Sequence, residues 1–198
     1  MKEKFDINKN LRMLKYTLAK DDLYEFLDDV DSKMTKKIYS IIKSHERSIE
    51  DEGKGYDKIV DLIAKMFQDD SNSSVYVLER TRLAEDGKIK VVPVSFIIYS
   101  TGREDNKNAH MELIYTDKRF LNVGYAEILV ENSFKDLIKE GYTSVNSVVA
   151  EDNTPSLNFN QKVIKKIADG KVYNRENGTY GFTFDITKLK KKEQERAD

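Results

Sequence analysis

The sequence predicts an α/β fold in a single domain, and three observations lead to that class. The chain has 198 residues, which is enough for one substantial hydrophobic core. Hydrophobic residues make up 39% and charged residues 35%, so this core would lie beneath a very polar surface. Segments alternate as strand, helices, three antiparallel-looking strands, helix, strand, helix and strand. The domain should cover residues 1–187, and the highly charged residues 188–198 should form a disordered tail.

The N-terminal third should hold one strand followed by amphipathic helices. Residues 11–18 have the pattern of a strand. Asp21 and Asp22 suit the start of a first helix, because carboxylates favour the positive end of a helix dipole. Two more helices are expected over about 34–49 and 56–68. Each has one apolar stripe, so each should cover one face of a larger structure.

The middle of the chain should form a hairpin and a third strand. Residues 75–82 and 90–100 have strand patterns, and residues 85–88 between them favour a tight turn. Pro93 lies inside the second strand and indicates a bulge or an edge position, because proline cannot donate to a neighbouring strand. The third strand is expected over 110–116.

The C-terminal part should alternate helix and strand. The expected elements are a helix over about 123–140, a strand over 145–150, a helix over about 154–168, and a strand or hairpin within 172–186. Gly141 suits the end of the first helix. Thr154 as a cap, with Pro155 at the first position, suits the start of the second. Asn177 and Gly178 favour a hairpin turn.

The stretch over residues 119–126 is the most informative, because it joins the strand at 111–116 to the next helix. A strand, a tight turn and a helix N-terminus make an anion site, since free N–H groups and the positive end of the macrodipole point at the turn. Gly124 would let a phosphate approach the backbone, and Asn122 accepts a left-handed conformation at low cost. We expect a phosphate-bearing ligand here; the alternative is an ordinary turn that binds nothing.

The same stretch resembles the acyl-CoA-binding motif of the GCN5-related N-acetyltransferase (GNAT) family, Arg/Gln-x-x-Gly-x-Gly/Ala. Arg119 matches its first position and Gly124 its last, while Asn122 replaces the middle glycine. Residues 144–158 resemble the family's next strand and helix, in the right order and at the right distance. The resemblance covers roughly 73–186. It implies a mixed, mostly antiparallel sheet flanked by helices, with extra N-terminal helical material.

The resemblance also implies that acetyl-CoA binds as the acyl donor. Loop N–H groups would hold its pyrophosphate, and the strands at 110–116 and 144–150 would part so that the pantetheine amides can pair between them. The implied cofactor-binding residues are Ile114, Tyr115, Thr116, Arg119, Leu121, Asn122, Val123, Gly124, Tyr125, Ala126, Asn153 and Asn158.

Two carboxylates are candidates for the catalytic base, because some family members use a carboxylate on the strand before the loop. Glu112 lies on that strand and alternation places it on one side with Ile114 and Thr116. Glu151, near the end of the adjacent strand, is the second candidate. The alternative for Glu112 is a structural or exposed glutamate. His110 follows a polar loop, which favours a solvated strand end.

Asn160 departs from the family pattern, which usually has a tyrosine there to protonate the departing thiolate. An amide cannot give up a proton at neutral pH. Another residue or water must then protonate the thiolate, or catalysis is weak.

Composition excludes several classes of function. The net charge of −1 argues against nucleic acid as the main partner. The absence of cysteine excludes disulfides, zinc–thiolate sites and cysteine nucleophiles, and with only two histidines we expect no metal site. No signal-peptide pattern and no long apolar run is visible, so we expect a cytoplasmic protein that does not bind a membrane.

The expected function is therefore acyl-CoA-dependent N-acyl transfer, with acetyl passing from acetyl-CoA to a primary amine by direct attack. The acidic run between Asp21 and Asp31 would attract a cationic amine, although a solvated helix face is the alternative. A non-catalytic acyl-CoA-binding or protein-interaction member that kept the fold is the alternative function, and Asn160 favours it. Homodimers are frequent in folds of this kind.

Overall fold

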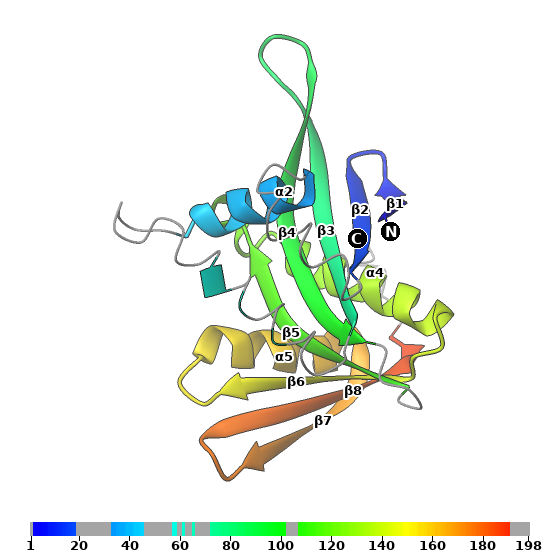
Figure 1. Ribbon diagram of the computed structural model, residues 1–198, viewed down its shortest axis with the longest axis vertical. Coiled ribbons are helices and arrows are strands. Elements are labelled where there is room, and N and C mark those ends of the chain that lie inside the picture. Colours follow the sequence, from blue (N-terminus) through cyan, green and yellow to red (C-terminus); the bar gives the residue numbers. More distant parts are fainter. Residues whose placement is uncertain are drawn as a thin grey trace, which may run out of the picture. The chain divides into compact units, whose positions relative to one another are not determined.

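The computed structural model describes residues 2–18, 33–45, 57, 58, 61, 65, 72–101 and 107–190 (Figure 1). The elements in chain order are β1 (Lys2–Asn8), β2 (Leu11–Leu18), α2 (Lys33–Lys43), β3 (Asn72–Leu83), β4 (Ile89–Thr101), β5 (Asn108–Thr116), the 3-10 helix η2 (Lys118–Phe120), α4 (Tyr125–Lys139), β6 (Ser144–Ala150), α5 (Thr154–Lys166), β7 (Ala168–Arg175) and β8 (Thr179–Leu189). Among these described residues, no helix is long and apolar enough to cross a membrane.

The strands hydrogen-bond in the order β1-β2-β3-β4-β5-β6-β8-β7. The parallel pair is β5 with β6, which are in register from Asn108↔Ser144 to His110↔Asn146. The pairs β1–β2, β2–β3, β3–β4, β6–β8 and β7–β8 are antiparallel. The predicted α/β class and mixed, mostly antiparallel sheet are confirmed.

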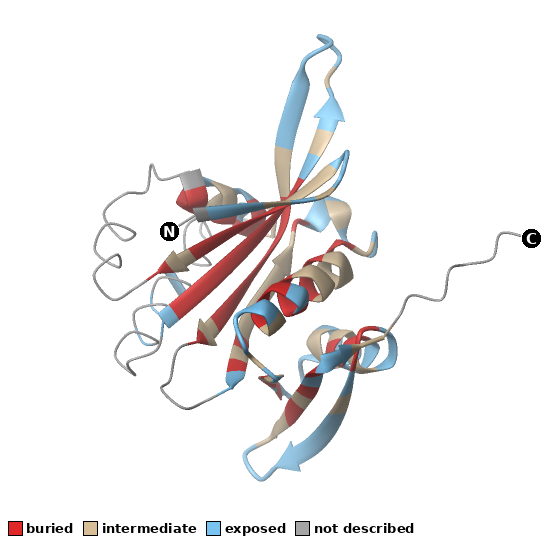
Figure 2. Cartoon of the chain, turned by 90° about the vertical axis from the view of Figure 1, so that its right-hand side faces the viewer, coloured by how far each residue is buried: buried red, intermediate tan, exposed pale blue. Residues whose placement is uncertain are grey.

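Contacts divide the chain into two compact units, which are described separately. The first comprises Met1–Glu104 with Glu112–Val130, and the second Asp105–Met111 with Glu131–Asp198. In the first unit, α2 packs on the buried face of β2, β3 and β4 (Figure 2). Ile38 and Ile41 on α2 are fully buried, as are Val75 and Val77 on β3. Apolar residues recur at helical spacing on α2, which gives this helix one apolar face. On β3, Val75 and Val77 point to the face that α2 covers, and the buried Tyr76 and Leu78 point to the opposite face.

The N-terminal elements differ from the prediction in two places. The strand at Leu11–Leu18 is confirmed, but β1 was not predicted; it forms an antiparallel hairpin with β2. The predicted helix over 34–49 ends at Lys43, because the Ser44 N–H donates to the Ile41 carbonyl in a turn. The helix expected from Asp21 lies outside the described residues, and so does most of the one expected over 56–68.

The β3–β4 hairpin extends beyond its neighbouring strands and ends in the predicted turn (Figure 1). Gly87 has a φ of 73°, and its N–H donates to the Ala84 carbonyl. The pairing skips Val94, because Leu78 pairs with Ser95 and the next residue pairs with Pro93. The bulge that Pro93 indicated is therefore present.

The second unit packs α5 and the C-terminal part of α4 on one face of β6 and β8. The Phe182 and Phe184 rings stack with their centroids 6.3 Å apart, and the ring centroid of Phe134 on α4 lies 5.9 Å from that of Phe184. The predicted end of α4 is confirmed, because Gly141 has a φ of 93° and the Tyr142 N–H donates to the Leu137 carbonyl.

The C-terminal hairpin and the start of α5 refine the prediction. β7 and β8 form the hairpin expected around Gly178. The cap of α5 is Asn153 and not Thr154, because the Asn153 side-chain oxygen accepts the Ser156 N–H at 3.2 Å. β8 extends to Leu189, past the predicted start of the tail at residue 188, and the Lys190 N–H donates to the Ile167 carbonyl.

A buried carboxylate joins three elements of the first unit. The Glu79 side chain on β3 is 1% exposed and contacts Arg12 Nε of β2 at 2.5 Å and Lys37 Nζ of α2 at 2.7 Å. The Lys37 ammonium also donates to the Tyr16 hydroxyl. A buried carboxylate needs nearby cations to offset the cost of losing its contact with water. A substitution that deletes the Glu79 carboxylate would leave Arg12 and Lys37 without this partner.

We predict that Glu79→Ala lowers the free energy of unfolding by about 3 kcal/mol, at the lower end of the range for a broken buried pair because both cations keep some solvent access. The free energy of unfolding is measured by urea titration, with circular dichroism as the signal. Asp6→Ala is the matched control, since it removes a carboxylate from an exposed pair with Lys4, and should cost under about 1 kcal/mol. Equal losses in the two variants would contradict the structural role of Glu79.

Candidate functional site

The turn between β5 and α4 has the backbone that the sequence predicted. Asn122 has a φ of 64° and Gly124 a φ of 89°. Among the described residues, Asn122 is the only residue other than glycine with a positive φ. The left-handed conformation expected of Asn122 is therefore confirmed, and Gly124 is left-handed as well; both residue types adopt this conformation at low cost.

The first backbone N–H groups of α4 lie at this turn. The first backbone bond of the helix runs from Ile128 N–H to the Gly124 carbonyl at 3.1 Å, so the preceding N–H groups have no carbonyl within the helix. The Tyr125 side chain is 8% exposed and meets the Phe120 ring edge-on at 6.0 Å, which fixes the first turn. Leu121 and Val123 are 48% and 58% exposed, so the loop faces solvent.

The electrostatics of the turn favour an anion. Glu127 in the first turn of α4 already places its carboxylate nearby, 3.3 Å from where a Cβ on Gly124 would lie. A carboxylate at a helix N-terminus is stabilised by the macrodipole and the free N–H groups. The same groups could hold a phosphate, which would have to displace or outcompete Glu127.

Asp117 anchors the loop and was missed by the sequence analysis. Its side chain is fully buried, and its N–H donates to the Val94 carbonyl at 2.9 Å. Arg119 donates to its carboxylate from the backbone N–H at 2.9 Å, from Nε at 3.0 Å and from Nη2 at 2.6 Å. The signal in the sequence was an aspartate at the end of a strand two residues before an arginine, a spacing that suits a local side-chain-to-backbone bond.

These contacts settle the charge state of Asp117. Burial by itself raises its pKa, but the hydrogen bonds from the Arg119 side chain and backbone, together with the Arg119 charge, outweigh burial and lower the pKa. The Arg119 guanidinium, predicted to contact the cofactor, is engaged by Asp117, although its side chain remains 67% exposed.

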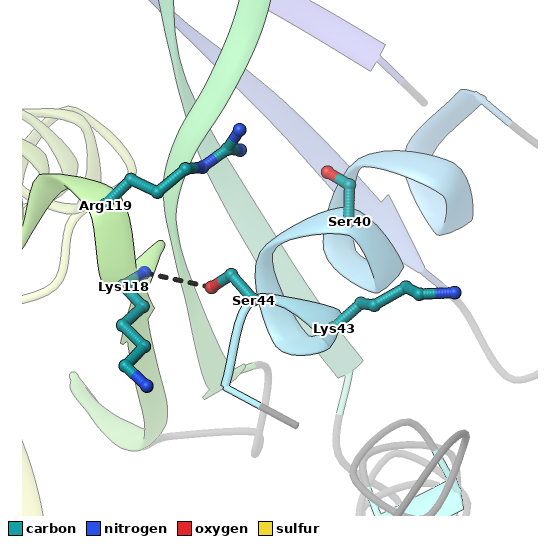
Figure 3. Close-up of a pocket in the computed structure, with 5 residues that line it drawn as sticks. All are labelled: Ser40, Lys43, Ser44, Lys118 and Arg119. Carbon is teal, nitrogen blue, oxygen red and sulfur yellow. Dashed lines mark hydrogen bonds between the residues drawn. The ribbon is translucent and has the colours of Figure 1, made fainter. Parts of the chain in front are cut away.

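The end of α2 holds the beginning of the same loop. The Lys118 N–H donates to Ser44 Oγ at 2.9 Å (Figure 3). His45 Nε2 lies 2.7 Å from the Thr116 carbonyl oxygen. The His45 ring meets the Tyr115 ring edge-on at 5.5 Å. Tyr115 also stacks on Phe96 and packs, partly buried, against the core, while its carbonyl accepts a hydrogen bond from Ser95 Oγ at 2.6 Å.

Glu112 lies on the side of β5 that alternation predicted. Leu113 and Tyr115 pack against the α2 core, so Glu112 faces the other side of the strand. Its carboxylate is half-buried and accepts a hydrogen bond from Ser100 Oγ of β4 at 2.7 Å. Thr116, on the same side, contacts Ser95 Oγ through its hydroxyl at 3.0 Å.

The candidates in the second unit are mostly exposed. Glu151 lies in the turn after β6, where its N–H donates to the Gly178 carbonyl. Asn153 caps α5, and Asn158 is exposed on that helix. His110 is half-buried at the start of β5.

Asn160 has a structural role that the sequence analysis missed. Its side chain is 2% exposed, accepts a hydrogen bond from Ser147 Oγ at 2.7 Å, and donates to the Ser156 carbonyl at 2.8 Å. The amide therefore joins β6 to α5. A buried asparagine is explained by these two bonds, because a buried polar group without partners is costly.

Comparisons with known proteins agree with this fold. The model of the acetyltransferase (GNAT) family matches residues 36–164. The chain belongs to the GNAT family and is an N-acetyltransferase that depends on acyl-CoA. No curated protein sequence matches it.

The chain is similar to solved structures of acetyltransferases at low sequence identity. A GNAT-family structure from Desulfovibrio desulfuricans has a TM-score of 0.54 at 10% identity, over 89% of this chain and 99% of that chain. A GNAT acetyltransferase from Listeria monocytogenes has a TM-score of 0.50 at 15% identity, over 92% and 99%. PaiA N-acetyltransferase from Thermoplasma acidophilum, in complex with coenzyme A, has a TM-score of 0.48 at 13% identity, over 87% and 98%.

Among the described residues, no group of three or more histidine, aspartate or glutamate side chains could hold a metal ion. The candidate site consists of the N–H groups at the start of α4, the left-handed turn before them, and the anchors Asp117, Ser44 and His45.

The lowered pKa of Asp117 predicts a pH-dependent contribution to stability. Because its folded pKa lies below the unfolded value of about 3.9, its contribution is fully present above that value and disappears as the pH falls through the folded pKa. Asp117→Asn should lower the free energy of unfolding by about 2 kcal/mol at pH 7, the scale of hydrogen bonds to a charged group.

The measurement is urea unfolding of both proteins between pH 7 and pH 3. We expect a constant difference down to about pH 5, which then shrinks below about pH 4. A difference that grows as the pH falls would show that Asp117 is destabilising when charged and would contradict this assignment.

Proposed function

We propose that the protein transfers an acetyl group from acetyl-CoA to a primary amine, and that the loop over residues 121–126 binds the pyrophosphate of the thioester. The observation that carries the proposal is the left-handed turn at Asn122 and Gly124 directly before the first N–H groups of α4, which precede the first hydrogen bond of the helix. Two phosphates at this position would receive backbone hydrogen bonds and the positive end of the helix dipole.

The reaction is a direct attack without a covalent enzyme intermediate. The amine nitrogen bonds to the thioester carbon, the carbon–sulfur bond breaks, and the sulfur leaves as the coenzyme A thiolate. The enzyme contributes by orienting both substrates and by donating backbone N–H groups to the carbonyl oxygen, where negative charge develops. Among the described residues, no cysteine is available as a nucleophile.

Glu112 is the proposed acceptor of the ammonium proton, directly or through a water. Its position on β5, in the strand that leads into the loop, supports this role, and Ser100 Oγ fixes its carboxylate through a hydrogen bond at 2.7 Å. A positioned carboxylate can take a proton if it lies within hydrogen-bond reach of the amine or of one intervening water. Glu151 and His110 are the alternatives.

The leaving thiolate is protonated by water on this proposal. Asn160 cannot give up a proton at neutral pH, and its side-chain amide makes two hydrogen bonds within the fold, to Ser147 and Ser156. A thiolate is already a fair leaving group, because thiol pKa values lie near neutrality, at about 8.5 for cysteine. The cost of lacking a side-chain acid is therefore modest.

The acceptor is a cationic amine if the acidic run between Asp21 and Asp31 takes part in binding, and this run lies outside the described residues. A coenzyme A release assay over polyamines, aminoglycosides and lysine peptides tests the acceptor class. Binding of acetyl-CoA without turnover on any of these amines would favour a non-catalytic member of the family.

Gly124→Glu tests the pyrophosphate site. The variant places a side chain at a left-handed position 3.3 Å from Glu127 and adds a negative charge where the phosphates should lie. Calorimetric titration with acetyl-CoA should show lost binding, while circular dichroism shows a retained fold. Gly87→Glu is the matched control, because Gly87 is also left-handed, at φ 73°, and lies in an open hairpin turn. Unchanged affinity in Gly124→Glu would refute the proposed site.

Glu112→Gln tests the base, since it keeps the shape of the side chain and removes its basicity. We expect the turnover number to fall by about a hundredfold or more, with acetyl-CoA affinity unchanged. Glu151→Gln tests the alternative base, and it should retain turnover if Glu112 accepts the proton. If the pH–rate profile of Glu112→Gln overlays that of the parent, Glu112 is structural and the base lies elsewhere.

A further inference from the structure

The β3–β4 hairpin ends in a two-stranded arm, residues 80–92, which extends beyond the neighbouring strands of the first unit (Figure 1). Pairing with β2 ends at Arg80, and on the other side of the hairpin the Asp117 N–H donates to the Val94 carbonyl, just before the arm begins. Beyond these points the two strands pair with each other as far as Leu83↔Ile89, beside the turn. Most residues of the arm are exposed, so a partner has access to both of its faces (Figure 2).

The arm is amphipathic because its sequence alternates. The strands read Arg-Thr-Arg-Leu over residues 80–83 and Lys-Ile-Lys-Val over residues 88–91. Successive side chains of a strand point to opposite faces, so one face of the arm carries the cations and the other the apolar side chains. The register keeps the two faces separate, because Leu83 pairs with Ile89 and Arg82 with Lys90.

The apolar face of the arm lies in solvent. Leu83 is 74% exposed, Ile89 73% and Val91 40%. Within the described part of the chain, Leu83 and Ile89 are the two most exposed large hydrophobic residues, and they are direct cross-strand partners. A single exposed apolar residue is ordinary, whereas adjacent ones on an extended arm indicate a binding surface.

The opposite face of the arm is cationic. It carries four exposed cations, at Arg80, Arg82, Lys88 and Lys90. Lys88 has a loose ion pair with Asp86, at 3.9 Å, and the other three form no ion pair with a described residue. Arg82 lies directly opposite Lys90, where like charges repel each other. An anionic partner would relieve this repulsion.

A bilayer that contains anionic lipids is the partner that accounts for both faces. A second copy of this chain would bring the cations of two arms together, and three aliphatic side chains a copy supply less than the about 800 Å² per partner that a stable interface buries. A nucleic acid would neutralise the cations but leave Leu83 and Ile89 in water. At a bilayer surface, apolar side chains enter the acyl boundary while Lys and Arg side chains reach the headgroup phosphates.

The turn of the arm determines how it would lie at such a surface. Glu85 and Asp86 are exposed in the turn, beyond the pair of Leu83 and Ile89. Carboxylates are costly in the hydrocarbon region, so the arm would not enter the bilayer tip first. It would lie flat in the interface with its apolar face toward the acyl chains, as an amphipathic helix does.

From these observations we infer that the arm binds the surface of a bilayer that contains anionic lipids, with Leu83, Ile89 and Val91 against the acyl chains and the cationic face among the headgroups. The absence of a long apolar run argues against a spanning segment, but it does not bear on a ribbon that lies in the interface. The binding is reversible, because the arm offers only a few apolar side chains. This inference is independent of the proposed acyl transfer.

The test is co-sedimentation of the full chain with vesicles of phosphatidylcholine alone and of phosphatidylcholine mixed with anionic phosphatidylglycerol. We expect at least about tenfold tighter binding to the anionic vesicles, a preference that weakens as salt is added. The charge variant, Arg82→Gln with Lys90→Gln, should lose about tenfold or more of this binding. The apolar variant, Leu83→Ser with Ile89→Ser, should lose about tenfold or more as well, because two aliphatic side chains no longer leave water.

The matched control is Lys171→Gln with Val172→Ser, which removes an exposed cation and an exposed apolar residue from β7. It should bind the vesicles as the parent does, and circular dichroism should show a retained fold in all variants. If the parent does not prefer anionic vesicles, or if the preference persists in both the charge variant and the apolar variant, the inference is wrong.

Two further measurements identify the other partners. A dimer in sedimentation equilibrium that disappears in the apolar variant, without vesicle binding by the parent, would show that a second copy covers the arm. Binding of a duplex oligonucleotide that is lost in the charge variant and kept in the apolar variant, again without vesicle binding, would show a nucleic-acid surface. Either result would overturn the membrane inference.

Discussion

The buried carboxylate of Asp117 is the constraint on which the candidate site depends. The Asp117 backbone N–H donates to the Val94 carbonyl, which lies at the bulge of β4. The Asp117 carboxylate accepts hydrogen bonds from the backbone N–H and the guanidinium of Arg119. Asp117 thereby connects β4 to the first residues of the loop through one buried side chain and its backbone. An anion site made of backbone N–H groups works only if those groups are oriented before the ligand arrives, because it has no side chain that could adapt.

Local patterns were enough to predict the parts of the site that depend on local physics. Asn122 and Gly124 were recognisable because few residues adopt a left-handed backbone at low cost, and both adopt it. Pro93 predicted a bulge because a missing N–H disturbs a strand pair whatever surrounds it. Gly141 predicted the end of α4 because many helices end at a residue in the left-handed conformation, which glycine adopts at low cost.

The features that escaped prediction depend on partners distant in the sequence. The sequence of β1 is mostly polar, and only its pairing with β2 makes it a strand. Asn160 looked like an empty acid position because its partner Ser147 lies on another element, which alignment to a motif cannot reveal. Asn153 and Thr154 are both good caps, and the choice between them depends on which side chain reaches the Ser156 N–H.

In the proposed binding mode, the carboxylate of Glu127 explains how the loop is stable without ligand and still binds one. Free N–H groups at a helix start are costly when nothing accepts from them, and an acidic residue in the first turn relieves part of that cost. A carboxylate on a flexible side chain brings a single charge, whereas a pyrophosphate can reach several N–H groups at once. The ligand can therefore replace Glu127 without any change of the backbone, which Asp117 and Ser44 hold in place. In this binding mode, the affinity for the thioester depends on how much more strongly the pyrophosphate binds the N–H groups than the Glu127 carboxylate does.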